Sequence, residues 1–408
     1  MKKVIVVLMI IGFISLIGYG IYYRFNMNIV MFKDIPVNKS DNKKDILLVH
    51  PNLLNSGALV MLHNLATILK KKNYSVYLLI FNDKKNVTYF EDLNIPVVKV
   101  DRKFFRTVKT QELKMFDLLI WNTYANYQKW LENRHRFKSI LWLHEMFTDL
   151  DGKLYYTNST LDKCLNNDEQ KSYRNKVVTV SNLAYCNAQK RIPIVTEDNI
   201  IYNFIDEKVM TKISDKKFDK KLKENNKNKI VFSMIGRIEP DKKQDIFIKA
   251  INLLPEEYKN KSFFYIVGDI ENEKYAKSLK INKLHNVKLV ENVPYKKMGV
   301  IYANTNVLLH PSQIDASPLV INEAAANNIP AVITNNTGST HIIKDGESGF
   351  VIPVGDAEAL KEKIIWFIDN PEQIEVMGEK ANQYYKETSS KEIFEEKWLQ
   401  LINKVLTE

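Results

Sequence analysis

Short, uniformly apolar runs alternate with amphipathic helical patterns along most of this chain, and this alternation restricts the possible fold more than any other feature. The first series starts at Asp45 and consists of DILLVHP, YSVYLLIF, PVVKV, FDLLIWNT, SILWLHE, KVVTVS and NIIYNFI. Strands that are apolar at every position are typical of a parallel sheet covered on both faces. Since helical crossovers connect such strands, the pattern predicts an α/β fold with a doubly wound sheet.

A second series of apolar runs begins near Asn228 and predicts a second sheet of the same kind. Its runs are KIVFSMIG, SFFYIVGD, NVKLVEN, TNVLLHPS, PAVITNN and GFVIPV. The charged segment DKKFDKKLKENNKNK between the two series is interpreted as an interdomain link or a solvated helix. We therefore expect two Rossmann-like halves, with a ligand in the crevice at the carboxyl ends of the strands. The expected boundaries are 45–205 for the first half, 206–227 for the link, 228–388 for the second half and 389–408 for a last helix.

The N-terminal run Val4–Tyr23, VIVVLMIIGFISLIGYGIYY, carries no charge and is about long enough to cross a bilayer. It is long for a signal peptide and lacks a clear A-x-A end, so we favour an uncleaved transmembrane anchor over residues 1–25. Residues 26–44 are polar and are expected to be a linker. Basic residues on both sides of the run leave its orientation open.

The net charge and the cysteine content of the chain restrict the classes of ligand that it can be expected to bind. The net charge of +11 suits a phosphate-bearing substrate or an anionic membrane surface, and no nucleic-acid motif is present. Cys164 and Cys186 are the only cysteines, and they form neither a disulfide framework nor a metal-ligand spacing.

The stretch Pro311–Gly338, PSQIDASPLVINEAAANNIPAVITNNTG, predicts a strand end, a loop, a helix, a turn and a strand. Ser317-Pro318 is expected to start the helix, with Ser317 as the cap, and Asn327-Asn328 to end it. Asp315 and Glu323 would then bracket a helix N-terminus, which is a favourable place for an anion or sugar hydroxyls. The alternative is an ordinary αβ unit with a solvated Asp and a surface Glu.

This stretch resembles the E-x7-E motif of the retaining family-4 glycosyltransferases, which are GT-B enzymes that use nucleotide sugars. The resemblance implies that Asp315 binds hydroxyls of the transferred sugar and that Glu323 holds the ribose. It also implies that backbone amides of the helix start contact the donor, at Ala316, Ser317, Pro318, Leu319 and Val320. The motif departs from the family in four places: Asp315 replaces a Glu, Asn328 and Thr337 each replace a Gly, and His341 stands where the family has a Glu.

The segment Ile235–Gln244, IGRIEPDKKQ, places two cations just after a predicted strand. Gly236, Arg237 and Lys242 match the family pattern G-R-L-x-x-x-K, with Ile238 in the Leu position. The resemblance implies that Arg237 and Lys242 grip the donor diphosphate. Arg offers a planar fork and Lys a compact charge to phosphate oxygens, and both would stabilise the leaving group. The alternative is a basic surface loop.

Two further family positions fall in the first half of the chain. Gly57, in a Ser-Gly-Ala turn that opens a helix, would let the backbone approach the donor phosphates. His144, in WLHE, corresponds to a His that contacts the transferred sugar, although a lone His at a strand end is more often structural. TVSN at Thr179–Asn182 and IYN at Ile201–Asn203 also match family positions.

The isolated Asp149-Leu150-Asp151 has the D-x-D form of metal-binding glycosyltransferases of another fold, but such a triplet is common by chance. We expect no essential metal and no cofactor other than the donor.

The resemblance as a whole predicts a membrane-anchored retaining glycosyltransferase with its catalytic part in the cytoplasm. It would move a sugar from a nucleotide-diphosphate donor, by family habit a UDP-sugar with GDP left open, to a cell-envelope or lipid-linked glycan. The last helix would cross back to the N-terminal half. The alternative is a non-catalytic GT-B partner subunit or scaffold, and a GT-B phosphorylase or epimerase is a weaker one.

Overall fold

The computed structural model of the chain contains two compact units. The described residues are 29–30, 43–50, 57–81, 87–100, 113–123, 130, 136–146, 176–190, 192, 195–210 and 215–408. Unit 1 comprises Met1–His144, Asn158–Val178 and Gln400–Glu408, and unit 2 comprises Glu145–Thr157 and Thr179–Leu399.

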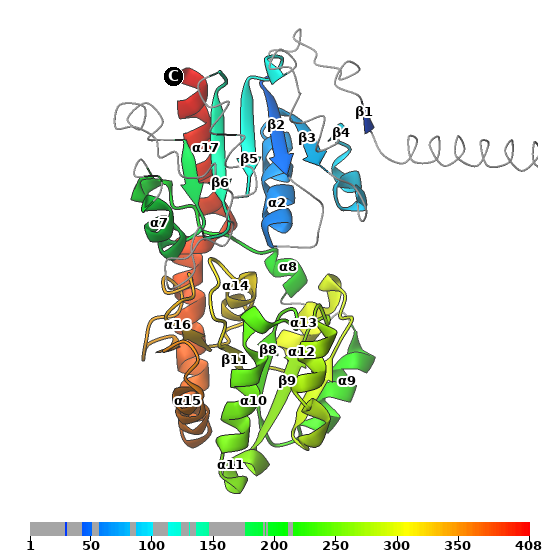
Figure 1. Cartoon of the computed structure of the whole chain (residues 1–408), viewed down its shortest axis with the longest axis vertical. Helices are drawn as coiled ribbons and strands as arrows, with labels where there is room; N and C mark the ends of the chain where they lie inside the picture. The colour runs from blue at the N-terminus through cyan, green and yellow to red at the C-terminus, as the bar shows by residue number, and fades with distance from the viewer. Residues whose placement is uncertain are drawn as a thin grey trace, which may run out of the picture. The chain divides into compact units, whose positions relative to one another are not determined.

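Unit 1 is built on a sheet with the strand order β1-β4-β3-β2-β5-β6-β7 (Figure 1). The strands are β1 (Ile29–Val30), β2 (Asp45–His50), β3 (Ser75–Phe81), β4 (Val97–Val100), β5 (Leu118–Asn122), β6 (Ser139–Leu143) and β7 (Val177–Thr179). The pairs from β1 to β6 are all parallel. Residues Asp45–His50 of the central strand β2 are all buried, which explains why its sequence shows no polar-apolar alternation.

The covering elements of unit 1 are α2 (Gly57–Lys71), the short 3-10 helix η2 (Val87–Leu93) and the last residues of the C-terminal helix α17 (Lys391–Thr407). Helix α2 buries an apolar stripe that includes Leu62, Leu65 and Leu69. The end of α17 is tied to unit 1 by polar contacts, since Tyr74 Oη donates to Asn403 Oδ1 at 3.1 Å and Lys138 Nζ donates to the Leu406 carbonyl at 2.5 Å.

The first half was expected to contain a strand at NIIYNFI, a polar linker and a membrane anchor. NIIYNFI was predicted to be a strand, but the structure has only an isolated bridge between Thr179 and Ile200 there, so this prediction is wrong. The short strand β1 lies in the segment expected to be a polar linker. The expected membrane anchor lies outside the described residues, and among the residues that are described no helix is both long and apolar enough to span a bilayer.

Unit 2 contains a parallel sheet with the order β10-β9-β8-β11-β12-β13 (Figure 1). Its strands are β8 (Ile230–Ile235), β9 (Ser262–Val267), β10 (Val287–Val290), β11 (Val307–His310), β12 (Ala331–Thr334) and β13 (Gly349–Ile352). Counted along the chain, this is the Rossmann order 3-2-1-4-5-6, and β2 to β7 repeat it in unit 1. The doubly wound prediction is therefore confirmed for both sheets.

Helices cover both faces of the unit 2 sheet. On one face, Phe232 and Met234 of β8 pack with α10 (Gln244–Leu253) and α15 (Ala357–Asp369). On the other face, Val231 and Ile235 pack with α13 (Met298–Tyr302), α14 (Leu319–Ala326) and α16 (Glu372–Ser389). Successive side chains of a strand point to opposite faces, so a strand that is covered on both must be apolar throughout.

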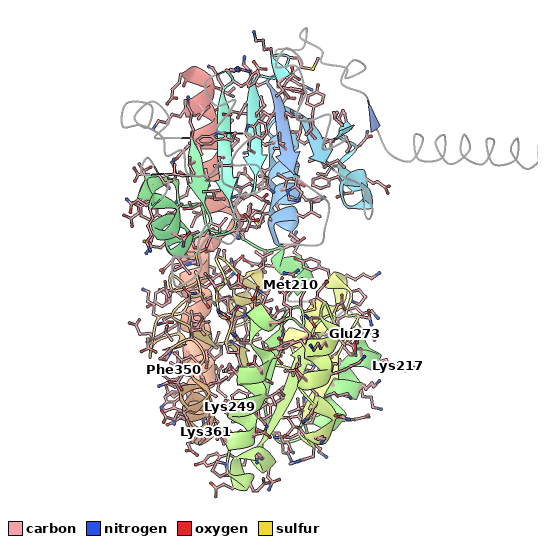
Figure 2. The ribbon with its side chains drawn as sticks, viewed as in Figure 1. Met210, Lys217, Lys249, Glu273, Phe350 and Lys361 are labelled. Carbon is pink, nitrogen blue, oxygen red and sulfur yellow. The ribbon has the colours of Figure 1, made fainter. Side chains whose placement is uncertain are left out.

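The remaining helices are shorter or more exposed. The expected link contains α8 (Glu207–Met210) and α9 (Lys216–Asn225), and α9 is rich in exposed lysines such as Lys217 (Figure 2). The others are α7 (Asn182–Gln189), η4 (Glu197–Asn199), η5 (Pro240–Lys242), α11 (Glu256–Lys261), α12 (Glu273–Ser278), η6 (Ile281–Lys283) and η7 (Tyr295–Lys297). The predicted last helix, 389–408, is present as α17.

Candidate active site

The candidate site of unit 2 lies where the strand order reverses, between β8 and β11. In sheets of this topology, the loops at the carboxyl ends of the two strands that flank this point diverge and leave room for a ligand. The loop after β8 carries Gly236, Arg237 and Lys242, and the loop after β11 carries Asp315. Four of the residues that the sequence singled out in the second half thus belong to adjacent loops.

Gly236 sits where β8 leaves the sheet, and its conformation favours glycine. Its φ is +153°, and its N–H still donates to the Val267 carbonyl at 2.9 Å. The neighbouring Gly268 is required by packing, because a Cβ there would lie 2.0 Å from the Gly236 carbonyl oxygen. Two glycines therefore let the two loop backbones approach closely at this point.

Arg237 is held through its backbone more than through its charged group. Its carbonyl accepts from Gln244 Nε2 at 2.9 Å, whereas its guanidinium is 55% exposed and pairs with Glu239 at 2.9 Å. An exposed ion pair of this kind is weak and is readily exchanged. The guanidinium is therefore available to an anionic ligand.

Lys242 and Asp315 form a much less exposed pair. Lys242 Nζ donates to Asp315 Oδ2 at 2.5 Å, with side-chain exposures of 20% and 16%. His310, the last residue of β11, places Nε2 3.3 Å from the same oxygen. Burial alone would raise the pKa of Asp315, but Lys242 and His310 outweigh it and hold the pKa well below its usual range.

Backbone contacts fix the two loops against each other. The Asp241 carbonyl accepts from the Gln313 N–H at 2.9 Å and from Ser312 Oγ at 3.0 Å. Asp241 precedes Lys242, and Gln313 lies two residues before Asp315. The ion pair is therefore set by a loop-to-loop connection and does not depend on side-chain reach alone.

The start of helix α14 differs from the prediction. The helix begins at Leu319 with Pro318 in the cap position, and no side chain caps it. The expectation that Ser317 caps the helix is wrong, because its Oγ accepts from Asn203 Nδ2 at 3.0 Å and is used to tie the loop to IYN. Among the described residues, no acceptor is found for the backbone N–H groups of Ala316, Ser317, Leu319 and Val320.

Ala316 is packed against the turn that follows β12. A Cβ on Gly338 would lie 1.8 Å from the Ala316 carbonyl oxygen, and the Gly338 N–H donates to the Asp315 carbonyl at 2.8 Å. Only the second glycine of the family's pair therefore has a steric reason to be present here. Asn328, which replaces the other family glycine, has a φ of +55°, the left-handed conformation that Asn tolerates.

Glu323 is not the surface residue that the structural alternative would require. Its exposure is 5%, and one carboxylate oxygen, Oε2, accepts from the Tyr302 hydroxyl. Burial raises the pKa of Glu323 to about 7, and the bond from Tyr302 opposes that rise. His341, in the place of the family Glu, instead stacks on Tyr202 with ring centroids 3.7 Å apart.

Gly57 and His144 belong to unit 1. Gly57 is the first residue of α2, next to Ala58, whose carbonyl accepts from Asn122 Nδ2 at 3.3 Å. His144 follows β6 and contacts Trp142, with ring centroids 4.3 Å apart. Burial, with a smaller effect of His50, lowers the pKa of His144 to about 3, and its Nε2 has no hydrogen-bond partner among the described residues.

Sequence reasoning missed four polar residues near these sites: Tyr302 and His310 in unit 2, and His50 and Asn122 in unit 1. Asn122 Nδ2 lies 3.0 Å from His50 Nδ1, and both residues end strands that flank the reversal of order in unit 1. His50, Asn122 and His310 are each a polar last residue of an apolar strand, which is a signal that the sequence contains. Tyr302 has no such signal, since it ends a short helix.

The chain resembles known glycosyltransferases over different lengths. Residues 215–384 match the family described as Glycosyl transferases group 1. The capsular polysaccharide biosynthesis glycosyltransferase CapM of Staphylococcus aureus is 26% identical over 197 residues, which are 48% of this chain and 50% of CapM. An Escherichia coli protein named UDP-Gal:alpha-D-GlcNAc-diphosphoundecaprenol alpha-1,3-galactosyltransferase is 27% identical over 183 residues, which are 42% of this chain and 45% of that protein. The match thus spans about half the length of these relatives.

Solved structures extend the likeness to the whole fold. HepE of Anabaena in complex with UDP-glucose has a TM-score of 0.71 with this chain at 18% identity, covering 89% of this chain and 100% of HepE. At that identity the likeness establishes the fold alone. Taken with the two Rossmann-like sheets, these findings show that the chain has the GT-B fold and that its residues 215–384 match the family Glycosyl transferases group 1.

Proposed function

We propose that this chain is a retaining glycosyltransferase that uses a UDP-sugar and acts on a lipid-linked or other cell-envelope glycan. The observation that carries the proposal is the convergence of Arg237, Lys242 and Asp315 on adjacent loops at the point of strand reversal in unit 2. A solvated surface loop would not hold a Lys–Asp pair with side-chain exposures of 20% and 16%. Fixed cations next to a carboxylate suit a ligand that has both a diphosphate and hydroxyl groups.

The chemistry follows from this arrangement. The bond between the sugar C1 and the phosphate oxygen breaks, and negative charge accumulates on the leaving diphosphate. Arg237 and Lys242 stabilise that charge, since they are in place before the reaction. The acceptor oxygen bonds to C1 from the same face, and its proton passes to the leaving phosphate.

Asp315 and Glu323 bind hydroxyl groups in this proposal. Asp315 Oδ2 accepts from Lys242 and lies 3.3 Å from His310 Nε2, so Oδ1 is the oxygen that would face a sugar hydroxyl. The shorter Asp side chain is thus held in place by two neighbours. Glu323 takes the nucleotide ribose, and the amide groups of 316, 317, 319 and 320 supply donors to the phosphate and the sugar.

Both substrates are proposed from the relatives. HepE was solved with UDP-glucose, and the Escherichia coli relative is named for UDP-Gal and for a diphosphoundecaprenol-linked acceptor. CapM is named for capsular polysaccharide biosynthesis. The apolar run Val4–Tyr23 would bring this chain to a membrane where such an acceptor resides, with the catalytic part in the cytoplasm beside its donor.

The test is a thermal-shift panel on the full chain in detergent, with UDP-glucose, UDP-galactose, UDP-N-acetylglucosamine and GDP-mannose, followed by an assay for UDP release. A bound donor raises the melting temperature by mass action. Stabilisation by a UDP-sugar, together with UDP release that Arg237→Ala strongly reduces, is the expected result. Binding without any turnover, in the presence of lipid-linked acceptors, would favour the non-catalytic partner subunit instead.

A further inference from the structure

The contact between Tyr302 and Glu323 has a consequence for how the donor is bound. Tyr302 is the last residue of α13, and Glu323 lies in the second turn of α14. Their side chains are joined by the hydrogen bond from the Tyr302 hydroxyl to Glu323 Oε2, and the two residues are 1% and 5% exposed. The other carboxylate oxygen, Oε1, has no hydrogen-bond partner among the described residues.

Tyr302 is fixed by the turn that follows it. Its carbonyl accepts from the Thr305 N–H at 3.0 Å, and Thr305 Oγ1 donates to the Ile301 carbonyl at 2.8 Å. The Thr305 hydroxyl also lies 2.7 Å from Ser233 Oγ, on the strand β8 that leads to Gly236 and Arg237. The backbone at Tyr302 is therefore connected, through Thr305, to the strand that leads to Arg237.

No cation faces Glu323 among the described residues. Its pKa is set by burial and, in the opposite direction, by Tyr302, and Tyr295 acts on Tyr302. Asp219 pairs with Lys223, and Lys297 pairs with Asp215. The other charged side chains of the elements packed against α13 and α14 (α8, α9, α16 and η7) are exposed: Glu207, Lys208, Lys216, Lys217, Lys220, Lys221, Glu224, Lys296, Glu372, Glu375, Glu379, Lys380, Lys386 and Glu387.

We propose that Tyr302 is a positioning residue: it holds one oxygen of Glu323 and so presents the other to the ribose hydroxyls of the nucleotide. This inference rests on the proposed function, because it takes Glu323 as a donor-binding group. A carboxylate that accepts bonds from Tyr302 and from a ribose hydroxyl is stabilised in its charged form. Since burial has raised the pKa of Glu323 to about 7, nucleotide binding releases a proton near neutral pH.

This proton release makes the affinity for the nucleotide depend on pH. Below pH 7 the empty site holds a proton that must leave, so the affinity falls as the pH decreases, by at most about tenfold for each pH unit. Above pH 7 the carboxylate is already charged, and the affinity reaches a plateau. Loss of the Tyr302 bond raises the pKa of Glu323 further, so the fall in affinity moves to higher pH.

The experiment measures the affinity of the full chain for UDP-glucose by calorimetry from pH 6 to pH 8.5, in two buffers that differ in ionisation enthalpy. UDP-glucose is the probe because its diphosphate, unlike that of UDP, does not titrate in this range. Wild type is expected to release a proton and to bind more tightly as the pH rises. Tyr302→Phe should bind about tenfold more weakly at pH 7, as a lost bond to a charged group implies, with its pH profile moved upward. Glu323→Gln should bind without proton release.

The matched control is Tyr258→Phe, which removes a Tyr–carboxylate bond of 3.1 Å to Asp369 on the surface of the same unit. It should leave the affinity and the pH profile unchanged, and melting curves of all variants show whether they fold. If Tyr302→Phe keeps both the affinity and the profile of wild type, or if wild type binds without proton release, the inference is wrong while the proposed function stands. If wild type binds neither UDP-glucose nor the other UDP-sugars of the thermal-shift panel at any pH, the donor assignment itself is wrong, and the inference with it.

Discussion

Lys242 Nζ donates to Asp315 Oδ2 at 2.5 Å, although 73 residues separate the two in the sequence. One residue follows β8 and the other follows β11, strands that are neighbours in the sheet. The pair links the two motifs that the sequence analysis had treated separately. Because Asp315 also lies beside His310, the carboxylate is charged and held in one place before any ligand arrives.

Removal of either cation is expected to reduce donor turnover. Arg237→Ala and Lys242→Ala should each lower kcat/KM. The loss should correspond to about 2–4 kcal/mol of transition-state stabilisation, the scale of losing a preorganised group that stabilises the leaving charge. Arg237→Lys should recover part of this, because it keeps the charge and loses the planar fork. The measurement is the rate of UDP release from the donor that the thermal-shift panel selects.

Lys249→Ala is the control for these two variants, because Lys249 is an exposed lysine on α10 (Figure 2). It should leave the rate of UDP release unchanged. Near-normal release by Arg237→Ala or Lys242→Ala would count against the assignment of the cations.

Asp315→Asn is expected to destabilise unit 2 in a pH-dependent way. The pKa of Asp315 is lowered in the folded state. Its contribution to the free energy of unfolding is therefore fully present above the unfolded pKa of about 3.9 and is lost as the pH falls further. At pH 7 the variant leaves Lys242, with 20% side-chain exposure, without its partner, which should cost about 2–4 kcal/mol.

Chemical denaturation at pH 7 and pH 3 measures the difference between Asp315→Asn and wild type, which should shrink at pH 3. Glu257→Gln, which removes a surface pair of 3.9 Å to Lys261, should cost less than about 1 kcal/mol at both values. An Asp315→Asn variant as stable as wild type at pH 7 would show that the pair does not contribute to folding.

Gly338→Ala should be more damaging than a glycine replacement made in open space. The new Cβ would lie 1.8 Å from the Ala316 carbonyl oxygen and 2.4 Å from Ser181 Oγ, so the loop that carries Asp315 has to move. We expect a loss of about 2–3 kcal/mol in the free energy of unfolding, within the range of severe steric substitutions.

Gly346→Ala provides the comparison, since it has a φ of +76° and nothing within 4 Å of the added atom. It should cost only the backbone strain, about 1 kcal/mol. Denaturation curves of the two variants side by side test the steric explanation, which equal losses would contradict.

Removal of divalent ions is expected to leave transfer intact. In the proposed mechanism, Arg237 and Lys242 neutralise the leaving diphosphate, so no metal is required for that step. UDP release after dialysis against EDTA should match that of the untreated protein. A complete loss of UDP release that Mg²⁺ restores would show that Arg237 and Lys242 alone do not neutralise the leaving diphosphate.

The positions of most strands along the chain, the doubly wound fold class and the main motifs could be predicted from local sequence. Runs such as KIVFSMIG and TNVLLHPS are apolar at every position because both faces of each strand are covered, and this leaves a direct trace in the sequence. The cations after β8 and the acids around α14 were recognisable from their resemblance to motifs of a known family. NIIYNFI was misjudged because its apolar side chains are buried, although its backbone forms only one isolated bridge among the described residues.

What only the tertiary structure decided is which of these groups meet, and in which state of charge. Lys242 reaches Asp315 because Asp241 is bonded to Ser312 and Gln313 across two loops, and no local pattern encodes that connection. Ser317 does not cap helix α14 as expected, because Asn203, distant in sequence, donates a hydrogen bond to its hydroxyl. Burial raises the pKa of Glu323 and ion pairing lowers that of Asp315, although both are carboxylates of one motif. Sequence spacing places a side chain on an element, whereas its solvation and its partners depend on contacts that form only when the chain has folded.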